Sequence, residues 1–226
     1  MKKLLILFAL ILFTCPSWAY DYVTVKESKE EQLINKIGFT ILNANRIPYR
    51  TSFVLNTKNI INASARYRDK KITVYKGLLY QVESDDELAA VLAHEISHVV
   101  DYSEGAFRGY FSYLKTGLSP RKYETKADKR AVDYLVKAGY NPLSYIVISN
   151  KIFGQERYEW LSTHPTGSKR MAEVYEYIYT KYPQYLAHNS YKDNIYYQNF
   201  LLTSRENRAK FEQKIKTNSK KKINYI

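Results

Sequence analysis

One short run of the chain, His94-Glu95-Ile96-Ser97-His98, has the residue types and the spacing of a metal site on a helix. Residues four apart on an α-helix lie on the same face, so both imidazoles can reach one ion. Neutral imidazole binds zinc well, and a catalytic zinc site has three protein ligands and an open position for water. Glu95 can reach that water without binding the metal. The motif therefore predicts a site where the metal acidifies a water molecule and Glu95 takes its proton.

The helix that carries this motif has a clear beginning in the sequence. Ser84 and Glu87 fit a capping box, and the acidic residues between them suit the positive end of a helix dipole. We expect the helix to run to about Asp101. The alternative is that both histidines lie on the exposed face of a surface helix and have no role. The three alanines in the first half of the helix argue against this, because they indicate another element packed closely against it.

A second helix, which begins at Ser119-Pro120, supplies two acids four residues apart, Glu124 and Asp128. Ala131 and Leu135 continue the same face, which is unusual for a fully solvated surface. We interpret Glu124 as the third metal ligand and Asp128 as the carboxylate that hydrogen-bonds a ligand histidine and fixes its ring. The alternative is an ordinary charged surface helix. The histidine motif favours the metal site over this alternative.

His164 is the third candidate, in the loop Thr163-His164-Pro165 that precedes a helix. Such loops often present functional groups. His164 could donate a hydrogen bond to the oxyanion of a tetrahedral intermediate, or it could bind the zinc in a resting state. The alternative is a histidine at a helix start without a role. His188 lies in a polar stretch and is assigned no role.

The periodicity of apolar residues predicts an α+β fold that is mostly helical, with a small sheet near the front of the chain. Besides the two helices above, helices are expected over residues 26–45, 141–153 and 167–182, and around 204–215. Strands are expected over 51–55, 62–65 and 72–75. Gly139 is the expected stop of the helix that begins at Ser119.

The amino terminus has the layout of a secretory signal peptide over residues 1–19, with two lysines, an apolar run from Leu4 to Phe13 and small residues before a cleavage site after Ala19. The apolar run is shorter than the ~20 residues that span a bilayer, and we expect no transmembrane helix. The protein is therefore expected to be exported, to the periplasm or outside the cell. Alternatively, Cys15, the only cysteine, could carry a lipid anchor.

The chain of 226 residues has a formal net charge of +13. For an exported protein, this charge favours anionic lipids or envelope polymers as partners over nucleic acid. Much of the excess lies in residues 183–226, a tyrosine-rich basic extension that is expected to be solvated and partly disordered. Residues 20–182 are then expected to form the domain that holds the metal.

These motifs together resemble the HtpX/Oma-type zinc metalloendopeptidases, peptidase family M48. The resembling stretches are Asn62 to Ala65, Ile72 to Leu79, Asp86 to His98, Glu124 to Asp128, Ala138 to Pro142, and Thr163 to Pro165 with Arg170. The resemblance implies a gluzincin (zincin-like) fold, one Zn²⁺ per chain, and cleavage of internal peptide bonds in misfolded or envelope proteins. It also implies that Ile72, Thr73, Val74 and Tyr75 form the edge strand along which a polypeptide substrate lies.

Two other functions fit parts of the sequence. A zinc-containing chaperone or assembly factor could hold exported proteins without cleaving them, although every catalytic position of the motif is filled. An envelope-surface adhesin could use the tyrosine-rich basic extension. We rank both below the peptidase, because neither requires Glu95 beside the two histidines.

Overall fold

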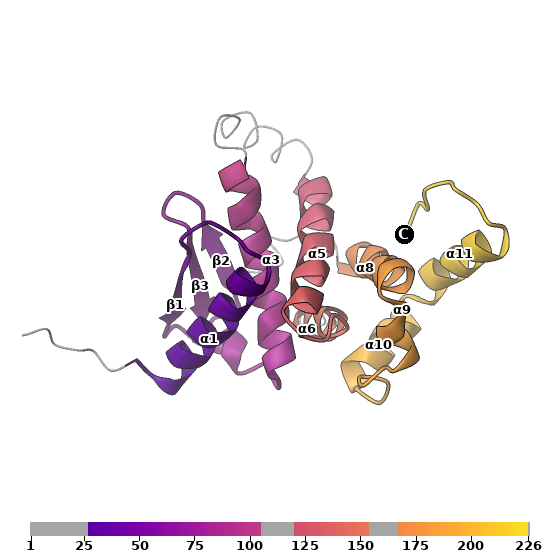
Figure 1. Cartoon of the computed structure of the whole chain (residues 1–226). Coiled ribbons are helices and arrows are strands. Elements are labelled where there is room, and N and C mark those ends of the chain that lie inside the picture. The colour runs from indigo at the N-terminus through magenta and orange to yellow at the C-terminus, as the bar shows by residue number, and fades with distance from the viewer. Residues whose placement is uncertain (1–26, 105–119, 154–166, 226) are drawn as a thin grey trace, which may run out of the picture.

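The structure is a computed structural model that describes residues 27–104, 120–153 and 167–225 (Figure 1). Its elements, in chain order, are α1 (Lys29–Ala44), β1 (Ser52–Asn56), β2 (Ala63–Arg66), β3 (Lys71–Tyr75), α2 (Lys76–Leu79), α3 (Asp85–Glu104), α5 (Pro120–Lys137), α6 (Ser144–Phe153), α8 (Gly167–Lys181), α9 (Pro183–Ala187), α10 (Ile195–Thr203) and α11 (Arg205–Lys216). The predicted fold class, mostly helical α+β with a small sheet near the front, is confirmed.

The sheet has the strand order β1-β3-β2, with β3 parallel to β1 and antiparallel to β2. Ile72 to Tyr75 therefore lie in the central strand, and the prediction that they form an edge is wrong. The β2–β3 hairpin folds β2 back along one side of β3, while β1 covers the other side. Strand propensity identifies a strand but not its neighbours. On the side of the sheet that faces α3, the edge is β2.

Helix α1 packs against β1 and α3 at the left of Figure 1. It begins with a capping box, in which Ser28 and Glu31 each accept a hydrogen bond from the backbone N–H of the other. Its contact with the sheet is close, because a Cβ on Gly38 would lie 2.4 Å from the ring of Phe53. This packing holds the sheet against the helix that carries the histidines.

Helices α3 and α5 lie side by side and run in opposite directions at the centre of Figure 1. The predicted stop of α5 at Gly139 is confirmed. Gly139 has a φ of +82°, and two hydrogen bonds close the helix end: Tyr140 N–H to the Leu135 carbonyl at 2.9 Å and Gly139 N–H to the Val136 carbonyl at 3.2 Å. The antiparallel pair brings residues about 30 positions apart in the sequence face to face.

The C-terminal residues 183–225 are folded, which corrects the expectation of a partly disordered extension. Helix α10 packs against α6, and α11 against α8. Four aromatic side chains of this region are buried: Tyr197, Phe200, Phe211 and Tyr225. The expected helix at 204–215 is confirmed as α11, whereas α9 and α10 were not anticipated, because their polar and aromatic residues show no clear helical periodicity.

Within the described ranges, no helix has the length and apolarity required to cross a bilayer.

Candidate metal centre

His94 and His98 project from one face of α3, as their spacing predicts. Their Nε2 atoms are 3.1 Å apart, and the two rings meet edge to face. The His94 side chain is 1% exposed and that of His98 is 11% exposed. Apolar residues of α3 fill the surrounding core, which holds both imidazoles at the boundary between the core and the surface.

Glu124 enters the same space from α5. Its Oε1 lies 3.4 Å from His98 Nε2, and its Oε2 lies 3.5 Å from His94 Nε2. These three residues form a group whose donor atoms can converge on one metal ion. The structure thus brings together the three side chains that the sequence selected from two helices.

The spacing of the three donors suits zinc. Ligand atoms at 2.0–2.2 Å from a tetrahedral zinc lie about 3.3–3.5 Å from one another, close to the separations of 3.1, 3.4 and 3.5 Å found here. Two imidazoles and one carboxylate are also a donor set used by catalytic zinc sites, which leave a fourth position for water. The residues present therefore fit a catalytic zinc ion.

Glu95 lies next to this cluster on α3 and is 1% exposed. The backbone N–H of Ala65 on β2 donates a hydrogen bond to its carboxylate. Burial, which disfavours the charged form, raises the pKa of Glu95 to about 7, and the nearby His94 imidazole opposes this shift. A carboxylate with a pKa near neutrality is suited to accept a proton and then return it.

Asp128 lies one turn after Glu124 on α5, and its Oδ1 is 3.2 Å from His94 Nδ1. Tyr145, on α6, donates its hydroxyl proton to Asp128, and the same hydroxyl oxygen lies 2.9 Å from His94 Nδ1. Both neighbours of Nδ1 are therefore hydrogen-bond acceptors. They favour the tautomer that carries its proton on Nδ1 and leaves the Nε2 lone pair for a metal.

Arg170, on α8, is a further member of this hydrogen-bond network. Its Nε donates to Asp128 Oδ2 at 2.8 Å, and its Nη1 lies 3.1 Å from Glu124 Oε2. Burial alone would raise the pKa of Asp128, but the charge and hydrogen bonds of Arg170 outweigh it and hold that pKa well below its usual range. Asp128 is thus an anion that orients His94.

Tyr145 and Arg170 are site residues that sequence reasoning did not assign. Arg170 was only part of a resembling stretch, and Tyr145 was not singled out. No spacing rule marks a tyrosine or an arginine on separate helices as neighbours of a metal ligand. Their hydrogen bonds to Asp128 place both side chains at the site, where they are buried at 2% and 1% exposure. His164 and Cys15 lie outside the described residues, as does the expected signal peptide.

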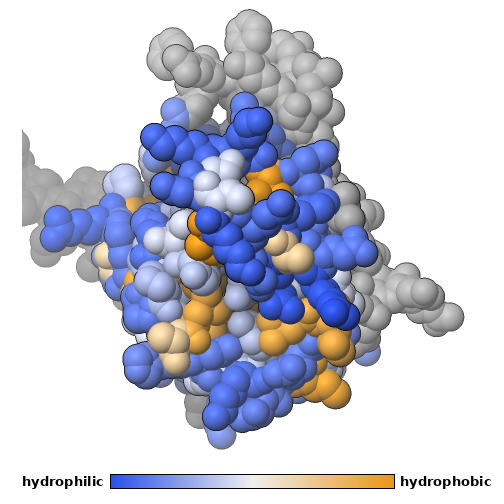
Figure 2. All heavy atoms as spheres, turned by 90° about the vertical axis from the view of Figure 1, so that its right-hand side faces the viewer, coloured by the Kyte–Doolittle hydropathy of each residue, from blue (hydrophilic) through white to orange (hydrophobic). Residues whose placement is uncertain are grey.

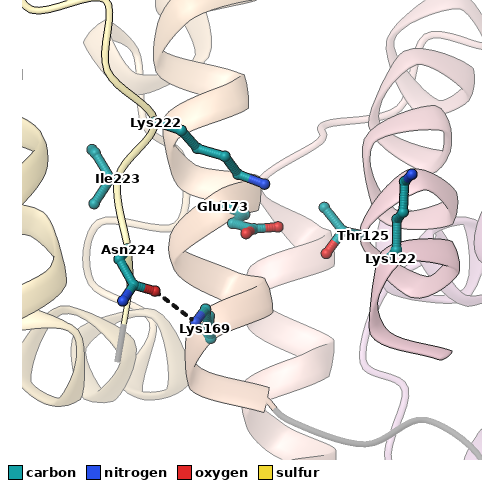
Figure 3. Close-up of a pocket in the computed structure, with 7 residues that line it drawn as sticks. All are labelled: Lys122, Thr125, Lys169, Glu173, Lys222, Ile223 and Asn224. Carbon is teal, nitrogen blue, oxygen red and sulfur yellow. Dashed lines mark hydrogen bonds between the residues drawn. The ribbon is translucent and has the colours of Figure 1, made fainter. Parts of the chain in front are cut away.

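A cavity with a volume of about 460 Å³ lies away from the metal centre, between α5, α8 and the C-terminal segment (Figure 3). It is lined by Lys122, Thr125, Lys169, Glu173, Lys222, Ile223 and Asn224. Figure 3 shows the Lys222 ammonium and the Glu173 carboxylate pointing into the space beside Thr125. None of the metal-site residues lines this cavity, so it is distinct from the candidate metal centre.

A mostly helical α+β domain whose paired helices present a His-His-Glu cluster is zincin-like, the architecture of a class of metallopeptidases. The sequence profile of peptidase family M48 matches residues 27–104 and 105–178, and the chain belongs to this family. The resemblance noted in the sequence is therefore confirmed, and it identifies the protein as a member of a metalloprotease family.

Proteins from several organisms are similar in sequence to parts of this chain. The chain is 32% identical over 126 residues to the mitochondrial metalloendopeptidase OMA1 of Arabidopsis thaliana, covering 44% of this chain and 26% of the relative. It is 24% identical over 184 residues to the beta-barrel assembly-enhancing protease of Escherichia coli strain K12, covering 63% and 38%. The Yersinia pestis protein of that name is 24% identical over 190 residues. The chain thus spans well under half the length of these relatives.

Proposed function

We propose that this protein is a zinc-dependent metalloendopeptidase that hydrolyses internal peptide bonds. The observation that carries the proposal is the convergence of His94, His98 and Glu124, from two helices, with donor separations suited to zinc. Glu95, a buried carboxylate beside this cluster, supplies the group that proton transfer requires. Membership of a peptidase family supports the same reaction.

Glu95 is the general base and then the general acid of the proposed reaction. Bound zinc would polarise the scissile carbonyl and lower the pKa of the attacking water. Glu95 takes a proton from that water and returns it to the leaving amine. The buried position of Glu95 favours this exchange, because a pKa near 7 makes the gain and the loss of a proton comparably easy.

Asp128, Tyr145 and Arg170 act through the ligands. The Asp128 carboxylate and the Tyr145 hydroxyl oxygen both act as hydrogen-bond acceptors for His94 Nδ1. These contacts keep the imidazole ring in one orientation. Arg170 holds Asp128 charged and also contacts the carboxylate of Glu124. One guanidinium therefore positions groups from both helices. We expect such positioning to govern how tightly the metal is held.

Substrate binding is assigned to β2 in place of the central strand. An extended peptide can add to a sheet edge through main-chain hydrogen bonds. β2 (Ala63–Arg66) is the edge that packs on α3, and Ala65 contacts Glu95 directly. A peptide paired with this strand would pass over the general base. His164 remains the proposed donor to the oxyanion, on sequence grounds alone.

We also propose that the protein is exported and acts on unfolded or envelope proteins. The signal-peptide layout of residues 1–19 supports export. The names of two relatives, a mitochondrial metalloendopeptidase and a beta-barrel assembly-enhancing protease, associate both proteins with proteolysis and the second with beta-barrel assembly. Lipid attachment at Cys15 is the alternative to a freely exported protein.

An anionic envelope or membrane surface remains the proposed partner of the basic C-terminal region. Residues 183–226 contain nine Lys and Arg against three Asp and Glu. Figure 2 shows that the face on this side of the molecule is mainly hydrophilic, with scattered hydrophobic patches. Lys122 and Lys169, which line the cavity of Figure 3, add to this positive surface. Such attraction should weaken as salt is added.

The test is metal analysis combined with proteolysis. We expect the purified protein to contain about one zinc per chain and to cleave casein, an unfolded protein. A chelator should abolish cleavage, and added zinc should restore it. Zinc content near zero after purification in zinc-containing buffer, or cleavage that persists in the chelator, would contradict the proposal. Zinc binding without cleavage would favour the non-catalytic chaperone.

A further inference from the structure

Two tyrosines from different elements stack beside the candidate metal centre. The rings of Tyr67 and Tyr102 have centroids 5.3 Å apart and an interplanar angle of 19°. Their exposed fractions are 42% and 41%, so each residue of this stacked pair is partly open to solvent. Single exposed aromatic residues are common and need no explanation. A stacked pair that joins two elements presents a larger, rigid apolar surface.

Tyr67 lies at the end of the edge strand along which the substrate is proposed to lie, as the first residue of the turn between β2 and β3. It directly follows β2, two residues after Ala65, whose N–H donates to the Glu95 carboxylate. Because an extended chain rises by about 3.3 Å per residue, Tyr67 lies at most about two residue lengths beyond Ala65, the residue beside the general base. Substrate side chains next to the scissile bond would reach this position.

Tyr102 continues the face of α3 that carries the metal ligands. It lies four residues after His98, one helical turn further along the same face. Partial burial, followed by the negative charges of Glu95 and Glu124, raises the pKa of Tyr67 to about 12. This influence agrees with a position of the Tyr67 hydroxyl close to the metal site.

We propose that the Tyr67–Tyr102 pair is a substrate subsite that selects an aromatic or large apolar side chain within two residues of the scissile bond. The inference rests on the proposed peptidase function and specifies its substrate. Asp101, the acid that precedes Tyr102 on α3, is already paired with Lys126 Nζ at 2.6 Å and Arg130 Nη1 at 2.7 Å. Because this carboxylate is paired, the faces of the two aromatic rings provide the contact surface of the proposed subsite.

The experiment measures cleavage of peptides that differ only near the scissile bond. The full protein, loaded with zinc, is given a randomised decapeptide library, and the cleavage sites are read by mass spectrometry. Matched peptides with Phe or Ala at the selected position then give kcat and KM. The variants are Tyr67→Ala, Tyr102→Ala and Tyr67→Phe, which keeps the ring.

Tyr80→Ala is the matched control. Tyr80 is 64% exposed and follows α2, at the end of the sheet opposite to Tyr67. We expect the wild-type protein, Tyr67→Phe and Tyr80→Ala to prefer Phe over Ala. Tyr67→Ala and Tyr102→Ala should lose about 2- to 10-fold of that preference, the range for one aromatic contact. The loss should fall mainly on KM, and Ala peptides should be cleaved as before.

Three outcomes would overturn the subsite. They are an unchanged preference in Tyr67→Ala and Tyr102→Ala, an equal loss for Phe and Ala peptides, and a preference for Lys or Arg at this position. The second would make the tyrosines structural. The third would replace aromatic stacking by attraction of a cation to the rings.

Binding to the Glu95→Gln variant separates this proposal from the proposed function. Fluorescence anisotropy of labelled Phe and Ala peptides needs no turnover. Tighter binding of the Phe peptide, lost when Tyr67→Ala is added, supports the subsite even if the wild-type protein cleaves nothing. Cleavage without any preference keeps the peptidase and removes the subsite.

Discussion

Arg170 and Asp128 form a buried ion pair between α8 and α5, with Nε donating to Oδ2 at 2.8 Å and Nη2 to Oδ1 at 2.5 Å. Both residues are 1% exposed. A buried charge is tolerated only where it is paired and hydrogen-bonded. Because Asp128 also lies beside His94, the pair couples the packing of α8 to the candidate metal centre.

Asp128→Asn should weaken zinc binding by about 10- to 100-fold, the usual effect of losing a group that orients a ligand histidine. Asparagine keeps the size of the side chain but removes the charge that holds the His94 ring. Competition with a fluorescent zinc chelator measures the affinity. Asp133→Asn, on the same helix but paired with Lys181 at the surface, is the control and should bind zinc normally. Equal affinities in the two variants would disprove this role for Asp128.

Arg170→Met should lower the free energy of unfolding by roughly 3–5 kcal/mol, because Asp128 is left buried without its counter-charge. Urea denaturation measures the change. Lys169→Met, at the neighbouring and partly exposed position, should change stability by less than about 0.5 kcal/mol. Adding Asp128→Asn to Arg170→Met should recover part of the loss, since the uncompensated charge is then removed. A double variant less stable than Arg170→Met would argue against this explanation.

Glu95→Gln should keep its zinc and lose turnover by about 10²- to 10⁴-fold, the typical contribution of a general base. Glutamine cannot take a proton from water, yet none of the three ligands changes. Zinc content and casein cleavage are measured on the same sample. His94→Ala is the contrasting variant, which should lose the metal itself. Cleavage at the wild-type rate by Glu95→Gln would remove Glu95 from its proposed role.

Removal of zinc should lower the thermal stability of the folded protein. A metal that binds only the folded state adds about 2.7 kcal/mol at a free concentration a hundred times its Kd. Thermal unfolding with and without a chelator should therefore show a lower Tm in the chelator. His94→Ala should show almost no difference between the two conditions, and a similar drop in that variant would indicate an effect of the chelator unrelated to this site.

Phe200→Ala should destabilise the protein by roughly 3–5 kcal/mol, the cost of a cavity where a buried aromatic ring was. Phe200 is 2% exposed on α10, whereas Leu202, two residues on, is 75% exposed. Leu202→Ala is therefore a matched control and should change stability by less than about 0.5 kcal/mol. Similar unfolding midpoints for both variants would show that the C-terminal helices do not share the core.

Local chemistry was readable from the sequence. The spacing of His94 and His98 places both imidazoles on one helix face, whatever surrounds that helix. Glu124 and Asp128 follow the same rule on α5, and the structure brings Glu124 to the histidines. The α+β class and most helix and strand positions were also predicted, because periodicity and capping residues act within a few positions of the chain.

Tertiary structure decided what depends on residues far apart in the chain. Strand order placed Ile72 to Tyr75 in the centre of the sheet and made β2 the edge beside Glu95. Packing between helices made Tyr145 and Arg170 neighbours of the metal ligands, although neither belongs to a spacing motif. The stacking of Tyr67 on Tyr102 joins a hairpin to a helix. Local spacing sets which face of an element a side chain occupies, and only packing between elements sets what that face meets.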